Sequence, residues 1–263
     1  MSRIGESFAR IRSSGKPGLV AYVTAGDPDL SRTADILVAL ANSGADVIEV
    51  GVPFSDPLAD GPVIQRASER ALASGTTLRR TLQMLCTMRN SIRSPIVLFT
   101  YVNPIVRMGE DEFVKAAVDA GVDGVLVLDL PVEEAGPFRQ RLVDAGIDPI
   151  FLLSPTTTDE RIRQSAQLGR GFLYIISRLG VTGARNHLAA DAEALVRRVR
   201  SLSALPLALG FGISTPEQVA QAGTYAEAAV VGSAIVNVIA EHGNAPDLAE
   251  RVGCYAKWLK GVA

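Results

Sequence analysis

Residues 43–51, SGADVIEVG, join the end of one predicted helix to a short apolar strand. The same joint returns at residues 120–123, AGVD, and at residues 145–148, AGID. A glycine at this position can take the left-handed conformation that ends a helix, and the residues after it enter a sheet. Repeated joints of this kind, without a long linker, predict one domain built from βα units.

Eight short runs rich in Val, Ile and Leu are separated by helical segments. They lack a clean alternation of apolar and polar residues, which is typical of strands covered on both faces. The runs are Leu19–Thr24, Val47–Gly51, Ile96–Tyr101, Gly124–Asp129, Asp148–Leu153, Gly171–Ile176, Pro206–Phe211 and Ala228–Gly232. They predict an α/β fold, a single-domain (β/α)₈ barrel over residues 1–263, with extra helices after the second and eighth strands. A doubly wound open sheet is the alternative, but no GxGxxG motif follows the first strand.

The N-terminal segment Met1–Lys16 is rich in Arg and Ser, as a transit peptide is. However, Ile4, Phe8 and Ile11 recur at helical spacing, so we expect a helix that packs on the core.

Composition excludes several classes of protein. The chain has 263 residues, of which 48% are hydrophobic and 21% charged, so it is not disordered. A net charge of −2 argues against a general nucleic-acid or anionic-membrane surface. The sequence contains no run of about 18 apolar residues, so it predicts no membrane span. Cys86 and Cys254 are far apart, which excludes a disulfide framework and a zinc–thiolate cluster and predicts reduced thiols in the cytoplasm.

Glu49 is the only charge inside an apolar strand. Alternation places it on the same face as Val47 and Gly51, and we expect that face to line the barrel near its open end. Partial desolvation there raises the pKa of a carboxyl and suits it to acid/base chemistry near neutral pH. The alternative is a structural carboxylate paired with an arginine.

Asp60 lies in the loop after the same strand, which carries three prolines within residues 53–62. This carboxylate can reach the same end of the barrel and fix a polar group of a ligand. The alternative is an N-cap for a helix over residues 61–73, because Asp before Gly-Pro suits a helix start.

Glycine motifs end the seventh and eighth strands, at Gly210–Ser214 and at Val231–Ile235. Barrels of this kind often bind phosphate with these two loops, where backbone N–H groups and a helix N-terminus face the anion. The segment 177–184 has two glycines and predicts a mobile lid.

The tyrosine, lysine and histidine residues limit the kinds of catalysis that the sequence allows. Tyr174 can face inward on the sixth strand and assist acid/base catalysis, or be a core tyrosine. None of the four lysines lies at the carboxyl end of a strand, which argues against a Schiff base. His187 and His242 lie outside the strands and form no HxH or HExxH motif, so no catalytic metal is expected. The sequence therefore predicts that carboxylates act on a small phosphorylated substrate.

Taken together, these motifs resemble the alpha subunit of tryptophan synthase, over almost the whole chain. The longest match is residues 49–65, EVGVPFSDPLADGPVIQ. The others are residues 24–28 (TAGDP), 101–104 (YVNP), 129–131 (DLP), 177–183, 211–214 (FGIS) and 232–233 (GS). The resemblance implies a TIM barrel that is a lyase: it cleaves indole-3-glycerol phosphate to indole and glyceraldehyde 3-phosphate in tryptophan biosynthesis.

The family's functional residues fall on matching positions of this sequence. The resemblance implies that Glu49 is the acid/base carboxylate, with Asp60 and Tyr174 as further catalytic residues. One carboxyl can protonate the indole carbon and deprotonate the neighbouring hydroxyl in turn, while the second stabilises the cationic ring nitrogen. The substrate-binding positions are Tyr22, Thr182, Gly183, Phe211, Gly212, Gly232 and Ser233. Tyr22 stands where family members often carry Phe.

A beta subunit that uses pyridoxal phosphate is the partner implied by the resemblance, in an alpha2–beta2 tetramer. The resemblance implies that the residues of this chain that contact the beta subunit are Pro53, Asp56, Pro57, Asn103 and Pro131. It also implies that the cofactor belongs to the partner. The alternatives are a stand-alone lyase that releases free indole, a sugar-phosphate isomerase barrel, and a non-catalytic activating subunit. The isomerase does not account for Glu49 and Asp60, and both residues argue against a non-catalytic role.

Overall fold

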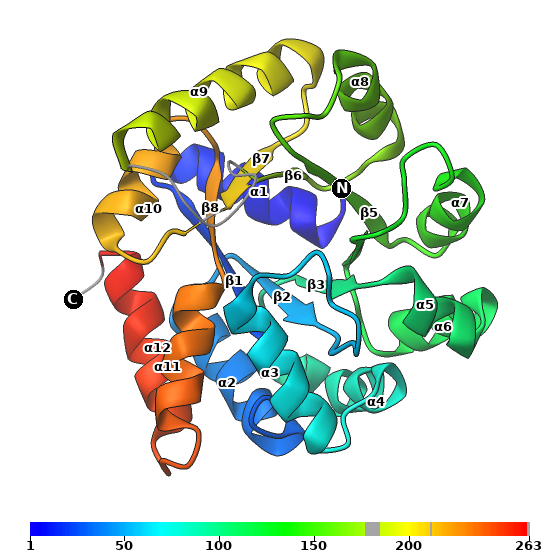
Figure 1. Ribbon diagram of the computed structural model, residues 1–263, viewed down its shortest axis with the longest axis vertical. Coiled ribbons are helices and arrows are strands. Elements are labelled where there is room, and N and C mark those ends of the chain that lie inside the picture. Colours follow the sequence, from blue (N-terminus) through cyan, green and yellow to red (C-terminus); the bar gives the residue numbers. More distant parts are fainter. Residues whose placement is uncertain (177–184, 211, 262–263) are drawn as a thin grey trace.

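The computed structural model describes residues 1–176, 185–210 and 212–261. Eight parallel strands close into a barrel in the order of the sequence, as predicted (Figure 1). The strands are β1 (Gly18–Thr24), β2 (Val47–Gly51), β3 (Ile96–Thr100), β4 (Gly124–Val127), β5 (Asp148–Leu153), β6 (Leu173–Ile176), β7 (Leu207–Gly210) and β8 (Ala228–Val231). The predicted ends differ from these by at most two residues.

Helices surround the barrel (Figure 1). They are α1 (Arg3–Ser14), α2 (Leu30–Asn42), α3 (Pro62–Ala73), α4 (Leu78–Met88), α5 (Val102–Met108), α6 (Glu110–Asp119), α7 (Gly136–Asp144), α8 (Asp159–Leu168), α9 (Arg185–Leu202), α10 (Pro216–Gly223), α11 (Ser233–His242) and α12 (Leu248–Leu259), with a short 3-10 helix, η1 (Arg89–Ser91). The predicted extra helices after β2 and β8 are α3 with α4 and α11 with α12. Sequence reasoning did not predict α5. In the part of the chain that is described, no helix is both long and apolar enough to cross a bilayer.

The glycine joints have the predicted geometry. Gly44, Gly121 and Gly146 have φ angles of 89°, 66° and 78°. In two of the three joints the aspartate has a second role, because it accepts a hydrogen bond from the first residues of the preceding strand. Asp46 Oδ2 accepts from Leu19 N–H, and Asp123 Oδ2 accepts from Ile96 N–H, both at 2.8 Å. At these two joints the motif therefore ends a helix and also ties neighbouring strands together.

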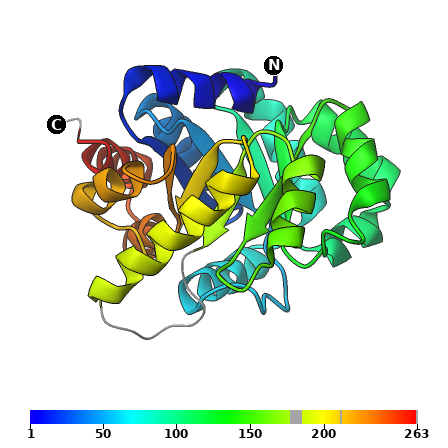
Figure 2. The same ribbon diagram turned by 90° about the horizontal axis from the view of Figure 1, so that it is seen from above.

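Helix α1 closes the amino end of the barrel. Ile4, Phe8 and Ile11 are buried, as predicted, against the inward-facing residues at the start of the strands. The ring centroids of Phe8 and Phe172 lie 5.1 Å apart. Figure 2 shows α1 (blue) across one end of the barrel and the segment after β2 at the other. This leaves the carboxyl ends of the strands open for a ligand.

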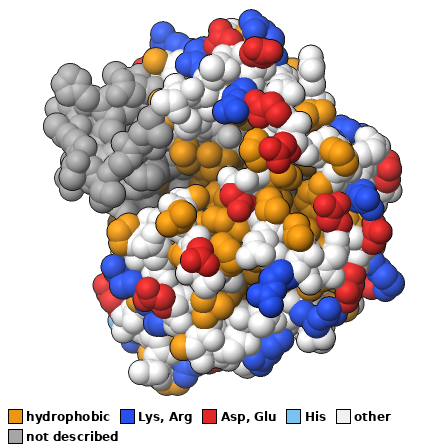
Figure 3. Space-filling model, turned by 45° about the vertical axis from the view of Figure 1, so that its right-hand side comes forward, with side chains coloured by type: hydrophobic (Ala, Val, Ile, Leu, Met, Phe, Trp, Pro, Cys, Tyr) orange, Lys and Arg blue, Asp and Glu red, His pale blue; other side chains and the backbone are white. Residues whose placement is uncertain are grey.

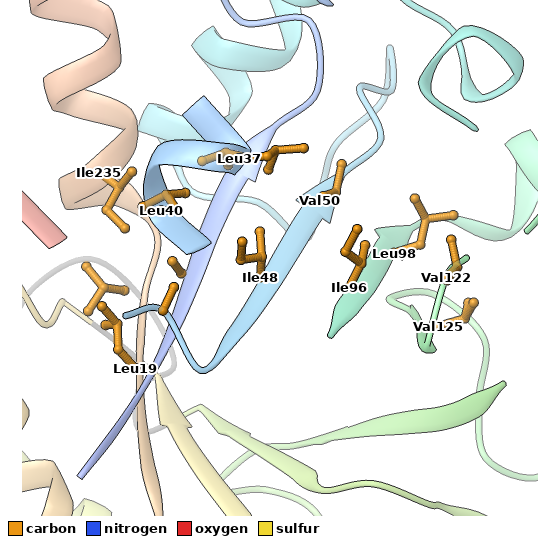
Figure 4. Packing of buried hydrophobic residues seen from close by; sticks show 14 of the residues in the cluster. Leu19, Leu37, Leu40, Ile48, Val50, Ile96, Leu98, Val122, Val125 and Ile235 are labelled. Atoms are coloured by element: carbon orange, nitrogen blue, oxygen red, sulfur yellow. The ribbon is translucent and has the colours of Figure 1, made fainter. Parts of the chain in front are cut away.

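The outward-facing side chains of the strands pack under the helices. Leu37 and Leu40 of α2 and Ile235 of α11 are fully buried around Leu19 and Ile48 (Figure 4). Burying one such side chain contributes about 1.5–3 kcal/mol. This layer fixes the strands, and so fixes the direction of the inward-facing residues between them.

Candidate active site

The inward-facing residues change in character along the barrel. Near the amino end they are fully buried. Toward the carboxyl end the inward-facing Phe99, Leu128, Leu152, Tyr174 and Ile176 are partly exposed. Figure 3 shows a hollow on the surface where hydrophobic side chains gather among acidic and basic ones. This end of the barrel can therefore accept an apolar group.

Glu49 lies on β2 between Tyr22 of β1 and Val97 of β3. It is 0% exposed, and neither carboxyl oxygen has a hydrogen-bond partner among the described residues. No ion pair to Glu49 occurs in that part of the chain either, so the alternative of a buried pair with an arginine finds no support there. Burial raises the pKa of Glu49 to about 8. This carboxyl is protonated at neutral pH and free to exchange its proton with a ligand.

Asp60 is held by Tyr101, which directly follows β3. The Tyr101 hydroxyl donates to Asp60 Oδ2 at 3.0 Å and accepts from the N–H of Ala59 at 3.2 Å. Burial raises the pKa of Asp60 to about 6, and the hydrogen bond from Tyr101 opposes that rise. Asp60 is therefore mostly ionised at pH 7, whereas Glu49 is mostly neutral.

The N-cap alternative for Asp60 is wrong. Helix α3 begins at Pro62 with Gly61 at its N-cap, and no side chain caps it. Instead the Gln65 side chain donates to the Asp60 carbonyl at 2.9 Å and fixes the loop. The Asp60 carboxylate is thus left to Tyr101 and to a ligand.

Tyr101 is the residue that sequence reasoning missed. It belongs to the YVNP motif, but nothing in the strand pattern links it to a carboxylate 41 positions earlier. The ring of Phe54 packs on it with centroids 5.0 Å apart, which brings the loops after β2 and β3 together. A tyrosine at the carboxyl end of a strand next to the one that bears Glu49 was the available signal.

Tyr22 of β1 and Tyr174 of β6 are two further polar residues of the candidate site. Burial raises both of their pKa values well above the usual 10, and the charges of Glu49 and Asp60 raise them further. Tyr22 is the register partner of Glu49 on the neighbouring strand, and both phenols stay neutral. Tyr22 also explains why position 51 is a glycine, because a Cβ there would lie 2.1 Å from the Tyr22 hydroxyl oxygen.

Three of the four predicted phosphate positions, Gly212, Gly232 and Ser233, lie in the described part of the chain. Gly212 is exposed with φ of 63°. Gly232 precedes α11 without a capping side chain, and the first helical bond runs from Val236 N–H to the Gly232 carbonyl. The N–H groups of Ser233 and the two residues after it are thus available to an anion. Thr182, Gly183, Phe211 and the expected lid at 177–184 lie outside the described residues.

Comparison with known proteins places this chain in a family. The family model for the tryptophan synthase alpha chain matches residues 8–260. The tryptophan synthase alpha chain of Burkholderia thailandensis is 49% identical and covers 100% of this chain and 98% of its own length. That of Methylococcus capsulatus is 48% identical, with coverages of 95% and 94%. This chain belongs to the tryptophan synthase alpha chain family.

Solved structures agree with this assignment. The tryptophan synthase alpha subunit of Legionella pneumophila superposes with a TM-score of 0.91 at 39% identity, covering 100% of this chain and 98% of that one. A chain of Mycobacterium tuberculosis tryptophan synthase superposes with a TM-score of 0.90 at 36% identity, with coverages of 99% and 98%. As a member of this family, the protein is a carbon–carbon lyase of tryptophan biosynthesis.

The residues of this chain that are expected to face the partner differ in exposure. Asp56, Asn103 and Pro131 are exposed and Pro57 is partly exposed, whereas Pro53 is buried. The described residues hold no cluster of three or more His, Cys, Asp or Glu side chains that is suited to a metal ion.

Proposed function

We propose that Glu49 and Asp60 carry out the alpha reaction, the retro-aldol cleavage of indole-3-glycerol phosphate to indole and glyceraldehyde 3-phosphate. The observation that carries this proposal is the Glu49 carboxyl: fully buried, without a hydrogen-bond partner among the described residues, and next to Tyr22 on the neighbouring strand. A buried group without a partner is costly unless a ligand completes it.

The cleavage requires two proton transfers, and Glu49 performs both in turn. As a neutral acid, Glu49 gives its proton to the ring carbon that bears the side chain, which leaves the ring nitrogen cationic. The Glu49 carboxylate then takes the proton of the neighbouring hydroxyl. The carbon–carbon bond breaks, its electrons return to the ring, and the hydroxyl carbon becomes the aldehyde of the triose phosphate. Glu49 ends protonated, as it began.

Asp60 stabilises the cationic ring nitrogen in this scheme. Its pKa of about 6 keeps it ionised while the Glu49 pKa of about 8 keeps that carboxyl neutral. Two carboxyls with such different environments can hold different protonation states at one pH. Tyr174 contributes a neutral phenol, and Tyr22, packed edge-on to Phe99 at 5.3 Å, lines the pocket for the indole ring.

The substrate phosphate binds between the ends of β7 and β8. Backbone N–H groups at Gly212, Gly232 and Ser233 supply donors, and the dipole of α11 adds positive charge. Thr182, Gly183 and Phe211 belong to the same substrate site in this proposal, on the strength of the family motifs they match.

The partner is a tryptophan synthase beta subunit in an alpha2–beta2 tetramer, and pyridoxal phosphate belongs to that subunit. Leu58 is 92% exposed and Val106 is 60% exposed, in the loop after β2 and in α5. Leu58 lies beside Asp56 and Pro57 in the sequence and Val106 lies close to Asn103, and these apolar side chains support an interface at this end of the barrel. We place Pro53 beneath this interface, since it is buried. The exposed free thiols of Cys86 and Cys254 suit a cytoplasmic location.

Activity is expected to have a bell-shaped pH dependence. Asp60 must be ionised and Glu49 protonated, so kcat/KM should be highest between about pH 6 and pH 8 and fall on either side. Indole release across pH 5–9.5 measures this. A profile that rises steadily through pH 9 would contradict the role of Glu49 as an acid.

Tyr101→Phe should shift only the acidic limb of that profile. The tyrosine hydroxyl lowers the pKa of Asp60, so its loss raises that pKa and moves the acidic limb to higher pH. The alkaline limb, set by Glu49, should stay near pH 8. Parallel pH profiles of the two proteins measure both limbs, and an unmoved acidic limb would show that Tyr101 does not tune Asp60.

The reaction itself is tested in deuterium oxide. The proton that enters the ring carbon comes from an exchangeable carboxyl, so released indole should carry one carbon-bound deuterium at that position. Triose phosphate should appear in equal amount. Mass spectrometry and carbon NMR of the indole decide the matter, and indole without carbon-bound deuterium would refute the mechanism.

The partnership is tested by size-exclusion chromatography with light scattering. The alpha chain alone and mixed with a beta subunit should differ in mass by the amount expected for the tetramer, and indole release should increase in the mixture. Unchanged mass together with full activity of the isolated chain would instead indicate a stand-alone lyase.

A further inference from the structure

The loop after β7 is held by side chains from two helices. Gln218 of α10 accepts hydrogen bonds through its Oε1 from Ser214 N–H at 2.8 Å and from Thr215 N–H at 3.2 Å. Tyr255 of α12 donates its hydroxyl hydrogen to the Ser214 carbonyl at 2.7 Å. Both backbone polar groups of Ser214 are therefore bound by side chains rather than by a neighbouring strand.

These contacts decide which amides of the loop can face a ligand. Ser214 N–H and Thr215 N–H are committed to Gln218. The N–H groups of Gly212 and Ile213 have no hydrogen-bond partner among the described residues. A Cβ at Gly212 would meet no atom of the described residues within 4 Å. The N–H groups of Gly212 and Ile213 therefore come immediately before the N–H groups of Ser214 and Thr215, which Gln218 holds in place.

We propose that Tyr255 is a positioning residue for the substrate phosphate, acting through the Ser214 carbonyl. Gln218 anchors the loop from the helix that follows it directly. Tyr255 supplies a second anchor from α12, whose residues 248–259 lie far later in the chain. Two anchors on separate helices hold the peptide planes in one orientation, so the Gly212 and Ile213 amides are presented without further ordering when the anion binds. This inference rests on the proposed phosphate site.

The Tyr255 side chain suits this role. It is partly buried, its ring packs on Trp258 with centroids 5.4 Å apart, and burial raises its pKa. A neutral phenol whose ring is already packed can hold its hydroxyl in one place. A phenylalanine keeps the ring and removes only the donor, so Tyr255→Phe isolates the hydrogen bond.

The test measures phosphate binding separately from indole binding. Tyr255→Phe should weaken the binding of glycerol phosphate, measured by calorimetry, by about three- to ten-fold, the range for one hydrogen bond. KM for indole-3-glycerol phosphate should rise by a similar factor. The kcat should stay within about two-fold, and the affinity for indole, which carries no phosphate, should not change.

Two further variants make the result decisive. Tyr225→Phe makes the same chemical change just before β8, at the other end of the barrel, and should leave all four quantities unchanged. Gln218→Met removes the other anchor and should weaken glycerol phosphate binding as well, which tests the loop even if Tyr255→Phe fails to fold.

The outcomes separate this inference from the proposed function. Wild-type affinity for glycerol phosphate in Tyr255→Phe, or an equal loss of glycerol phosphate and indole binding, would overturn the role of Tyr255. If the wild-type chain does not bind glycerol phosphate at all, the phosphate site itself is wrong.

Discussion

Glu49→Gln is expected to lower indole formation by ~10²–10⁴-fold, the usual cost of losing a general acid/base. Glutamine keeps nearly the same shape but can neither give nor take the proton. Binding of glycerol phosphate should persist, because the proposed phosphate site is formed by the loops after β7 and β8 and not by β2, which carries Glu49. Indole release and calorimetry on one purified preparation measure both quantities.

Thermal stability provides the control for this variant. The folded state keeps Glu49 protonated up to about pH 8, whereas an ordinary carboxyl ionises near 4.5. The native state therefore binds more protons than the unfolded state in this interval, and wild-type stability falls as pH rises through it. Glutamine cannot ionise, so Tm of the variant should equal or exceed that of the wild type at pH 8. Near-normal turnover with a lower Tm would contradict the catalytic assignment and indicate a structural carboxylate.

Gly232→Asp is expected to weaken glycerol phosphate binding by ~10²-fold or more, because a carboxylate would face the anion across a few ångströms. The side chain itself fits: a Cβ at Gly232 would lie 3.5 Å from the Tyr22 Cβ, an ordinary contact. Charge rather than size should therefore dominate the loss.

Gly232→Asn is the matched control, with nearly the same volume and no charge. Calorimetric titration of wild type and both variants with glycerol phosphate separates the two effects. If asparagine and aspartate weaken binding equally, crowding and not charge is responsible. If neither weakens it, the phosphate does not bind at the N-terminus of α11.

The barrel was predictable because its signals are local. Gly44, Gly121 and Gly146 each mark the end of a helix within a few residues, and the apolar strands carry the rest of the pattern. Glu49 was predictable for the same reason, since a lone charge in an apolar strand is visible in five residues. Helix α5 was not, because YVNP carries a proline that reads as a break, although a proline in the first turn loses no hydrogen bond.

Contacts between distant segments could not be predicted. The hydrogen bonds from Tyr101 to Asp60 and from Tyr255 to Ser214 each join residues 41 positions apart. They depend on how loops and helices pack, which no periodicity encodes. The same limit applies to the N-cap interpretation of Asp60: Asp-Gly-Pro suits a cap, but the structure turns the carboxylate toward Tyr101.

The central claim is that Glu49 is a neutral acid at physiological pH, and a direct titration tests it. Carbon-13 NMR of protein labelled at glutamate carboxyl carbons, compared with Glu49→Gln, identifies the Glu49 resonance. We expect that resonance to titrate with a pKa of about 8, in the ligand-free chain. A resonance that titrates near the ordinary value of 4.5 would mean that Glu49 is already ionised at neutral pH, and would contradict the account.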